Sequence, residues 1–314
     1  VWDEVFGQSN GAASGSSGDP LWQPQHRWAS SVKMLARVDQ APDVRLGVQA
    51  VETTTQLFSE TLLTGFDDFQ ESQGVGGYGG QTIFASYIDR LMSFFERDVG
   101  RPPIMIASVV ATGGGSYSEI GPGTDTATKT SRARRSARRL CGGTGVQIVR
   151  APRKGLHGEG DVLRFLQSYI ANLIAGSGAT GYGGELLAWQ SSDDTSAITD
   201  LGLHASHRGL DIWITPGRDL AGQPRVSSGM AMSWAARMDP AHHVVAGPGY
   251  PIMAVYGDPS DPQHYPREGL EIIGELFAIA EYERFWRLND AWQAMNMVAV
   301  RYVDSTHVDV DIHV

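Results

Sequence analysis

The run Ile104-Met105-Ile106-Ala107-Ser108-Val109-Val110-Ala111 is a strong strand signal, and it decides the fold class of this chain. Pro102-Pro103 precede it and Gly113-Gly114-Gly115 follow it. A short run rich in isoleucine and valine and bounded by turn residues is typical of a buried strand. We therefore predict a strand over residues 104–111.

On both sides of this run, short apolar runs alternate with segments of helical periodicity. Further apolar runs lie at 1–6, 186–189, 210–215 and 243–246. Apolar residues at helical spacing form three stripes, which are Phe84, Tyr87, Ile88, Leu91, Met92 and Phe95, then Val162, Phe165, Leu166, Tyr169, Ile170 and Leu173, and finally Leu270, Ile273, Gly274, Phe277 and Ala278. This alternation predicts an α/β fold built around a parallel sheet.

The last part of the chain has a different period. Val298, Val300 and Tyr302 are apolar at every second position, which predicts a β hairpin or the opening of a β module after about residue 292. We therefore expect one large domain over residues 1–291. A β-strand segment over 292–314 follows it and could start an accessory module. The chain also lacks an initiator Met, so we expect it to be a piece of a longer protein.

Composition excludes several classes of protein. The 314 residues are 41% hydrophobic and 19% charged, as expected of a globular protein, and the net charge is −10. This acidity argues against nucleic acid or an anionic membrane as a partner of the whole surface. The single cysteine, Cys141, excludes an intrachain disulfide and a cysteine-based metal cluster. No apolar run approaches the roughly 20 residues of a membrane helix.

Two clusters of ionisable residues have plain structural interpretations. The basic cluster holds Lys129, Arg132, Arg134, Arg135, Arg138 and Arg139. It is typical of the solvated face of a helix, although it could also attract an anionic glycan. His204, His207, His242 and His243 have no Asp or Glu at a spacing that completes a metal site, so we expect no metal there.

Candidate catalytic residues lie near the two ends of the chain. Ser9, in Gly7-Gln8-Ser9-Asn10, follows the first apolar run, at the strand tip where parallel sheets bind ligands. Asp261 and His264 lie in Asp261-Pro262-Gln263-His264. Their three-residue offset lets the carboxylate accept a hydrogen bond from Nδ1 while Nε2 faces a serine. The sequence therefore offers a nucleophile, a base and a carboxylate in the order Ser, Asp, His.

A second Asp-x-x-His occurs at Asp304 and His307. This copy joins two alternating β segments, contains no proline or glycine, and no helix follows it. We therefore assign the catalytic pair to Asp261 and His264.

Four blocks in this order resemble the sialate O-acetylesterase and carbohydrate esterase family 6 branch of the SGNH hydrolases. The blocks are Gly7-Gln8-Ser9-Asn10, Thr112-Gly113-Gly114-Gly115, Leu186-Leu187-Ala188-Trp189-Gln190 and Asp261-Pro262-Gln263-His264. The resemblance spans residues 7 to 278. It implies a three-layer α/β/α, flavodoxin-like fold with Ser9 as nucleophile, His264 as base and Asp261 as its orienting partner, and no metal or cofactor.

The resemblance also implies an oxyanion hole, the set of donors that stabilises the negative charge of a tetrahedral intermediate. Its donors would be the backbone N–H groups of Ser9 and Gly114, with Gly113 or Gly115 as alternatives to Gly114, and the side chain of Gln190. The family's third block is a strand ending in Trp-x-Gln-Gly-Glu-Ser-Asp, and Ser191 and Ser192 replace its Gly and Glu here. Gln190 could equally cap a following helix.

These residues lead to one functional prediction and two alternatives. We expect a serine esterase that hydrolyses small acyl esters, and the resemblance implies O-acetyl groups on carbohydrates. One alternative is a catalytically inactive module of the same fold that binds carbohydrate or has a structural role in a larger phage or surface protein. The other is a lipase or thioesterase for long acyl chains, although no apolar lid is evident.

Overall fold

The structure is a computed structural model, and it describes residues 1–7, 28, 31–37, 63–68, 82–111, 120–157, 182–207, 209–217, 227–261, 264–294, 296–302 and 308–313.

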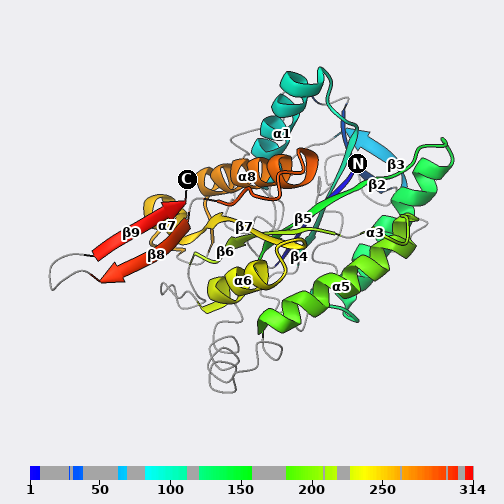
Figure 1. Cartoon of the computed structure of the whole chain (residues 1–314). Coiled ribbons are helices and arrows are strands. Elements are labelled where there is room, and N and C mark those ends of the chain that lie inside the picture. Colours follow the sequence, from blue (N-terminus) through cyan, green and yellow to red (C-terminus); the bar gives the residue numbers. More distant parts are fainter. Residues whose placement is uncertain are drawn as a thin grey trace.

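A seven-stranded sheet forms the centre of the fold, with strand order β3-β2-β4-β1-β5-β6-β7 (Figure 1). Its strands are β1 (Trp2–Gly7), β2 (Val32–Arg37), β3 (Leu63–Asp68), β4 (Met105–Ala111), β5 (Arg150–Leu156), β6 (Asp211–Thr215) and β7 (His243–Pro248). Every neighbouring pair is parallel except β2 and β3, so only β3, at the edge, runs the other way. Strand β1 therefore lies in the middle of a mostly parallel sheet.

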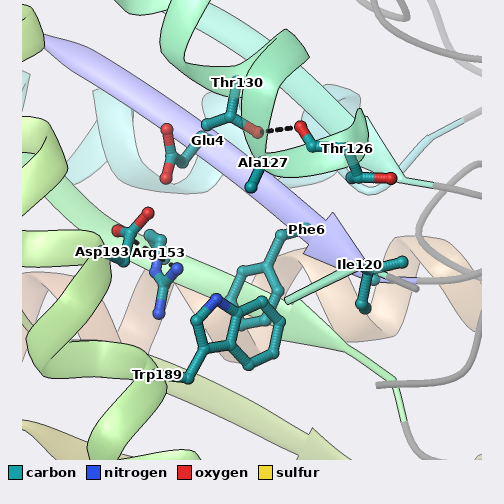
Figure 2. A pocket seen from close by; sticks show the side chains of 10 residues that line it. Glu4, Phe6, Ile120, Thr126, Ala127, Thr130, Arg153, Trp189 and Asp193 are labelled. Carbon is teal, nitrogen blue, oxygen red and sulfur yellow. Dashed lines mark hydrogen bonds and ion pairs between the residues drawn. The ribbon is translucent and has the colours of Figure 1, made fainter. Parts of the chain in front are cut away.

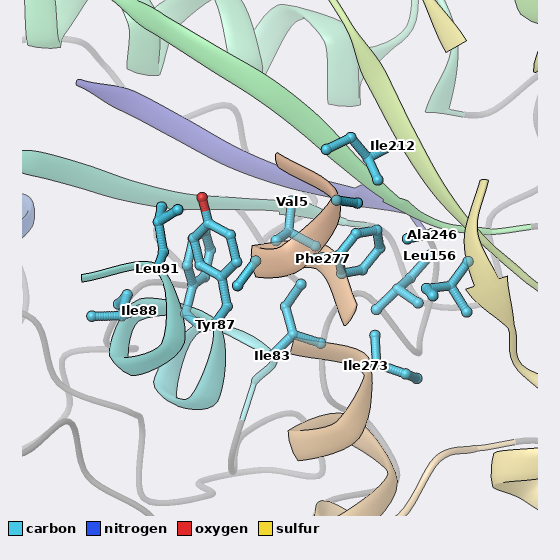
Figure 3. Close-up of a cluster of buried hydrophobic side chains, with 14 of the residues drawn as sticks. Val5, Ile83, Tyr87, Ile88, Leu91, Leu156, Ile212, Ala246, Ile273 and Phe277 are labelled. Atoms are coloured by element: carbon cyan, nitrogen blue, oxygen red, sulfur yellow. The ribbon is translucent and has the colours of Figure 1, made fainter. Parts of the chain in front are cut away.

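Helices cover both faces of this sheet (Figure 1). The described helices are α1 (Phe84–Val99), α3 (Asp125–Gly142), α5 (Tyr182–Leu201), α6 (Ser227–Met238), α7 (Tyr250–Tyr256) and α8 (Arg267–Glu281), and a short π-helix, η2 (Tyr282–Trp286), follows α8. The apolar stripes of α1 and α8 pack with Val5 and Ile212 on one face, as Figure 3 shows. Helices α3, α5 and α6 pack with Trp2, Phe6 and Trp213 on the other face. The fold is therefore a three-layer α/β/α sandwich, as the sequence predicts.

Most of the predicted elements are confirmed. Strands lie where the runs at 1–6, 104–111, 210–215 and 243–246 predict them, and α1 and α8 contain their predicted stripes. The strand predicted at 186–189 is wrong, because these residues lie within α5. The helix predicted from the stripe at 162–173 lies outside the described residues.

The predicted change of architecture near the end of the chain is confirmed. Strands β8 (Asn296–Tyr302) and β9 (Val308–His313) pair antiparallel in a two-stranded sheet separate from the main one. The boundary between 291 and 292, and the role of this hairpin as the start of an accessory module, stay predictions.

The sequence did not predict β5, although β5 lies beside the central strand. Its sequence, Arg150 to Leu156, carries three basic side chains and Pro152, and proline is rare in interior strands because it cannot donate to the ladder. Here the register between β1 and β5 shifts between Trp2 and Glu4, so β5 fits one more residue than β1 into the same length. This irregularity accommodates Pro152.

The basic side chains of β5 are buried because acidic side chains meet them on both faces of the sheet. On the face covered by α3 and α5, Arg150 and Arg153 join Arg134 of α3 in one network with Glu4, Asp193, Asp194 and Asp211. Burial favours the neutral acid at Asp193, but three guanidinium groups outweigh this effect and hold the pKa of Asp193 below its usual range. We refer to this set as the arginine network.

Arg134 corrects the interpretation of the basic cluster as a solvated face. Arg135, Arg138 and Arg139 of α3 are exposed, as expected, but Arg134 is buried and paired with Glu4. The cluster is helical, as predicted, with one member facing inward.

A second network lies on the face covered by α1 and α8. Lys154 forms ion pairs with Asp3 and Glu281, and the Tyr87 hydroxyl lies 2.5 Å from Asp3 and 2.7 Å from Glu281. A hydroxyl can donate only one hydrogen, so one of these two contacts requires a protonated carboxyl group. Burial accordingly raises the pKa of Asp3 to about 7, against the attraction of Lys154. We refer to this set as the lysine network.

Candidate active site

The carboxyl ends of the parallel strands define the edge at which such sheets bind ligands. At this edge, Gly7 at the end of β1 pairs with Ala111 at the end of β4 and with Leu156 at the end of β5. Strands β6 and β7 end nearby at Thr215 and Pro248. The segments that follow β4, β1 and β5 therefore start side by side.

Ser9 and Gly114 lie outside the described residues, two and three positions beyond the ends of β1 and β4. Gly7 shows what the backbone requires just before Ser9. Its φ of 153° is unfavourable for other residues, and a β-carbon there would overlap the carbonyl oxygen of Leu156. The glycine of the Gly-Gln-Ser-Asn block therefore allows β1 and β5 to approach closely at the candidate site.

Asp261 and His264 are in hydrogen-bond contact. His264 Nδ1 lies 2.9 Å from both carboxylate oxygens of Asp261. The side chain of His264 is 23% exposed and that of Asp261 is 43% exposed, so solvent reaches both. The contact matches the arrangement predicted from the three-residue offset. The competing pair, Asp304 and His307, lies outside the described residues.

A tight turn holds Asp261 in place. The carboxylate of Asp258 accepts hydrogen bonds from the backbone N–H and the hydroxyl of Ser260, both at 2.7 Å. The Asp261 N–H donates to the Asp258 carbonyl at 3.0 Å. These hydrogen bonds from Ser260 also lower the pKa of Asp258. The carboxylate that orients His264 is thus fixed by its own local chain.

The residue after His264 locates this turn on the sheet. Tyr265 is 1% exposed, and its hydroxyl lies beside Gly217 and Gly249. These glycines come just after the ends of β6 and β7. The Asp261 and His264 pair therefore belongs to the same edge of the sheet as the end of β1.

Gln190 does not lie at this edge. It is buried within α5, and its amide donates to Asp194 at 2.6 Å and to the carbonyl of Gly209 at 3.0 Å. Gly209 precedes β6, and Asp194 pairs with Arg150 at the start of β5, so Gln190 lies at the amino ends of the strands. The prediction that Gln190 ends a strand is wrong, and we no longer assign its amide to the oxyanion hole.

His157, which the sequence did not single out, lies at this edge of the sheet. His157 directly follows β5, one residue beyond the Leu156 that pairs with Gly7, and it is 1% exposed. The sequence from this strand end is Gly155-Leu156-His157-Gly158-Glu159-Gly160-Asp161. It contains the Gly, Glu and Asp of the third family block at their expected offsets, with His157 in the place of Gln. Residues 158–161 lie outside the described part of the chain.

A small cavity lies on the α3 and α5 side of the β1 end (Figure 2). It measures about 30 Å³, and its lining includes Phe6, Gly7, Ile120, Arg153 and Trp189. The guanidinium of Arg153 lies over the rings of Phe6 and Trp189. A volume of this size holds a few waters at most. The cavity is therefore too small to hold an ester substrate.

Three of the four histidines considered above as metal ligands have other side-chain contacts. His242 contacts Asp239, His243 accepts a hydrogen bond from Trp213, and His204 contacts Ser206. Within the described residues, no group of three or more His, Cys, Asp or Glu side chains is arranged to hold a metal. None of the helices described is long and apolar enough to cross a membrane.

Comparisons with known proteins support the fold. No protein-family model matches the chain, and no curated protein matches its sequence. A crystallographically determined protein from Arabidopsis thaliana is similar with a TM-score of 0.51 and 15% identity, over 90% of this chain and 98% of that chain. The structure named NanS is similar with a TM-score of 0.51 and 12% identity, over 92% of this chain and 98% of that chain.

A carbohydrate acetylesterase from Xanthomonas citri has a TM-score of 0.48 and 13% identity, over 100% of this chain and 62% of that chain. At these identities, the likeness to the Arabidopsis protein and to NanS shows a shared fold.

Proposed function

We propose that this protein is a serine esterase that hydrolyses small acyl esters, with Ser9 as nucleophile and His264 as general base. The observation that carries the proposal is the contact of His264 Nδ1 with both carboxylate oxygens of Asp261. This contact fixes the tautomer that leaves Nε2 free to accept a proton. A histidine oriented in this way at the carboxyl edge of a parallel sheet suits the activation of a hydroxyl nucleophile.

The reach of the chain agrees with this role for Ser9. Ser9 lies two positions beyond Gly7, and two residues span at most about 7 Å. In the sheet, β5 and β6 lie between β1 and β7, and neighbouring strands lie about 4.8 Å apart. The end of β1 thus lies about 10 Å from that of β6 and about 14 Å from that of β7, and the residues up to Ser9 can cover up to about 7 Å of this distance towards His264.

In the proposed reaction, His264 removes the Ser9 hydroxyl proton as the oxygen attacks the ester carbonyl. The negative charge of the tetrahedral intermediate is stabilised by the N–H groups of Ser9 and Gly114 and by an N–H of the His157 ring. The intermediate collapses, the alcohol leaves with the proton from His264, and an acyl-serine remains. Water then attacks the acyl-serine with His264 again as base, and His264 returns this proton to the Ser9 oxygen as the bond to the acyl carbon breaks and the carboxylic acid leaves.

We propose His157 as the third oxyanion donor because it follows the strand beside β1 and takes the place of the family's Gln. The Gly158, Glu159 and Asp161 that follow it also weaken the case for an inactive module, since that alternative rested on the lack of Gly and Glu after Gln190. The resemblance implies O-acetyl groups on carbohydrates as substrates, so we propose an acetylated glycan as the natural ester.

The test is hydrolysis of nitrophenyl acetate, butyrate and octanoate, together with acetate release from acetylated polysaccharide. We expect preference for acetate and a loss of kcat of at least about 1,000-fold in Ser9→Ala and in His264→Ala. A fluorophosphonate probe should label wild type at Ser9, as seen by peptide mass spectrometry.

Ser233→Ala and His307→Ala are matched controls that should keep kcat close to wild type. Equal turnover in wild type and Ser9→Ala would disprove the proposal. So would loss of activity in His307→Ala with none in His264→Ala. No turnover of any ester would favour the inactive module, and preference for octanoate would favour a lipase.

A further inference from the structure

Tyr265 is a buried phenol attached directly to the exposed end of the candidate site. Its ring belongs to the core shared by α1, α8 and the sheet, whereas its neighbour His264 faces Asp261 and solvent. Pro266 follows it, and a residue before proline is biased towards extended backbone, in which successive side chains point in opposite directions. An inward Tyr265 therefore favours an outward His264.

Two glycines form a slot for the phenol hydroxyl. A β-carbon at Gly249 would overlap the Tyr265 hydroxyl and the carbonyl oxygen of Thr215, and one at Gly217 would lie 3.0 Å from the same hydroxyl. Gly249 has a φ of −80°, which any residue adopts, so its backbone conformation does not require glycine. The small size of the residue at 249 is explained by the closeness of Tyr265 and Thr215.

The slot is rigid because it is built from the sheet itself. The N–H of Gly249 donates to the Thr215 carbonyl at 2.9 Å, which joins the residue after β7 to the last residue of β6. Met253 of α7 lies against the same slot at Gly217 and is buried. The end of the Tyr265 ring is therefore seated on two strand ends and one helix.

We propose that Tyr265 is a positioning residue that sets the place of His264 relative to the end of β1. This inference rests on the proposed function, since it assigns Tyr265 a role through His264. The turn from Asp258 to Asp261 orients His264 within its own loop, but that loop is half exposed and its own hydrogen bonds are local. Among these residues, Tyr265 provides the deep contact with the sheet that carries β1.

The experiment compares Tyr265→Leu and Tyr265→Phe with Tyr282→Ala. Leu cannot reach the slot, and a shift of His264 by about 1 Å can cost on the order of 100-fold in rate, so we expect Tyr265→Leu to lose about 100-fold in kcat for nitrophenyl acetate. KM should stay within about twofold, because substrate binding does not use Tyr265. Tyr265→Phe keeps the ring, so we expect its kcat to be at least about tenfold higher than that of Tyr265→Leu.

Tyr282→Ala is the matched control, because Tyr282 is a buried tyrosine of the same core at a distance from the slot, bonded to Asp98. It should lose stability and keep kcat per folded molecule. Thermal melts and circular dichroism check that each variant folds, and the rate of Ser9 labelling by fluorophosphonate reports activation by His264 directly.

A misplaced His264 should cost about 100-fold in rate. If Tyr265→Leu folds and its kcat and its labelling rate both stay within threefold of those of Tyr282→Ala, the positioning role is wrong. If Tyr265→Leu fails to fold, Tyr265→Met takes its place, and its labelling rate is judged against that of Tyr282→Ala by the same threefold criterion. Full activity in His264→Ala would instead overturn the proposed function, which separates the two failures.

Discussion

The two ends of β1 make opposite use of the same strand. In its first half, Asp3 and Glu4 are buried, point to opposite faces and enter the lysine and arginine networks. At its other end, Gly7 has no side chain and leads into the Ser9 segment. The buried ion pairs that stabilise the fold thus lie at the start of the strand, and the proposed chemistry lies beyond its end. Substitutions at the two ends should therefore separate loss of fold from loss of activity.

The largest effect is expected at the proposed chemical end, for Asp261→Asn. An amide keeps the shape of Asp261 but favours the wrong tautomer of His264, so kcat should fall by about 10,000-fold. The Asp261 side chain is 43% exposed, so the free energy of unfolding should change little. Steady-state kinetics and urea unfolding check both statements. A protein that unfolds, or one that keeps its kcat, would break the comparison.

The next effect is expected at the buried end, for Glu4→Gln. This substitution removes one of the two carboxylates that pair with the buried Arg134 and leaves Asp193 as the other, so it should cost about 3 kcal/mol of unfolding free energy. The kcat per folded molecule should stay near wild type. Glu275→Gln is the control, since its pair with Arg90 is exposed and should contribute at most about 1 kcal/mol. Equal losses in both variants would contradict a special role for the arginine network.

The third effect is a pH dependence of stability that comes from Asp3 in the lysine network. Folded Asp3 holds a proton up to about pH 7, whereas an unfolded aspartate releases it near pH 3.8. The folded state therefore binds more protons in this window, and the contribution of Asp3 to stability falls as pH rises through it. The fall should be of the order of 2 to 4 kcal/mol.

Urea unfolding of wild type and Asp3→Asn between about pH 4.5 and 7.5 measures this fall. We expect the stability of Asp3→Asn relative to wild type to increase with pH. Asp98→Asn should show no such trend, since hydrogen bonds from Arg97 and Tyr282 hold the pKa of Asp98 below its usual range. A constant difference between wild type and Asp3→Asn would show that the lysine network carries no shared proton.

The smallest effect is expected for Gln190→Ala. Its amide bonds Asp194 and Gly209 at the amino ends of the strands, so removal should cost about 1 to 2 kcal/mol of stability. The kcat should stay within about twofold of wild type, because no oxyanion donor is lost. His157→Ala is the opposite case and should lower kcat about 100-fold or more. The reverse result would restore Gln190 to the oxyanion hole.

The local sequence pattern predicted the strands and helices that bury apolar side chains. The stripes of α1 and α8 have a helical period, and the run at 104–111 is rich in isoleucine and valine and is bounded by proline and glycine, as is typical of a buried strand. Leu186 to Trp189 is different, because a short apolar run fits a buried strand and a helix equally well. The polar residues after this run did not distinguish the two, since Asp193 and Asp194 form ion pairs with arginines of α3 and β5, which are distant in sequence.

The same reason hid β5 and with it His157. A segment with Arg150, Pro152, Arg153 and Lys154 does not look like an interior strand, since charged residues and proline avoid that position. Its charges are compensated by carboxylates distant in sequence, and no local rule detects them. The offset of Gly158, Glu159 and Asp161 was the available signal. The contact of Asp261 with His264 depends on one local turn, and the sequence predicted it.

The place of β1 in the sheet also bears on how the protein is made. Its two neighbours, β4 and β5, come about 100 and 150 residues later in the chain. At a synthesis rate of about 5 to 20 residues per second, the ribosome needs of the order of 10 seconds to supply both. Until β4 emerges, Trp2, Val5 and Phe6 have neither neighbouring strand, and until β5 emerges they have only one. The nascent chain should therefore depend on chaperones that shield such segments until β5 has emerged.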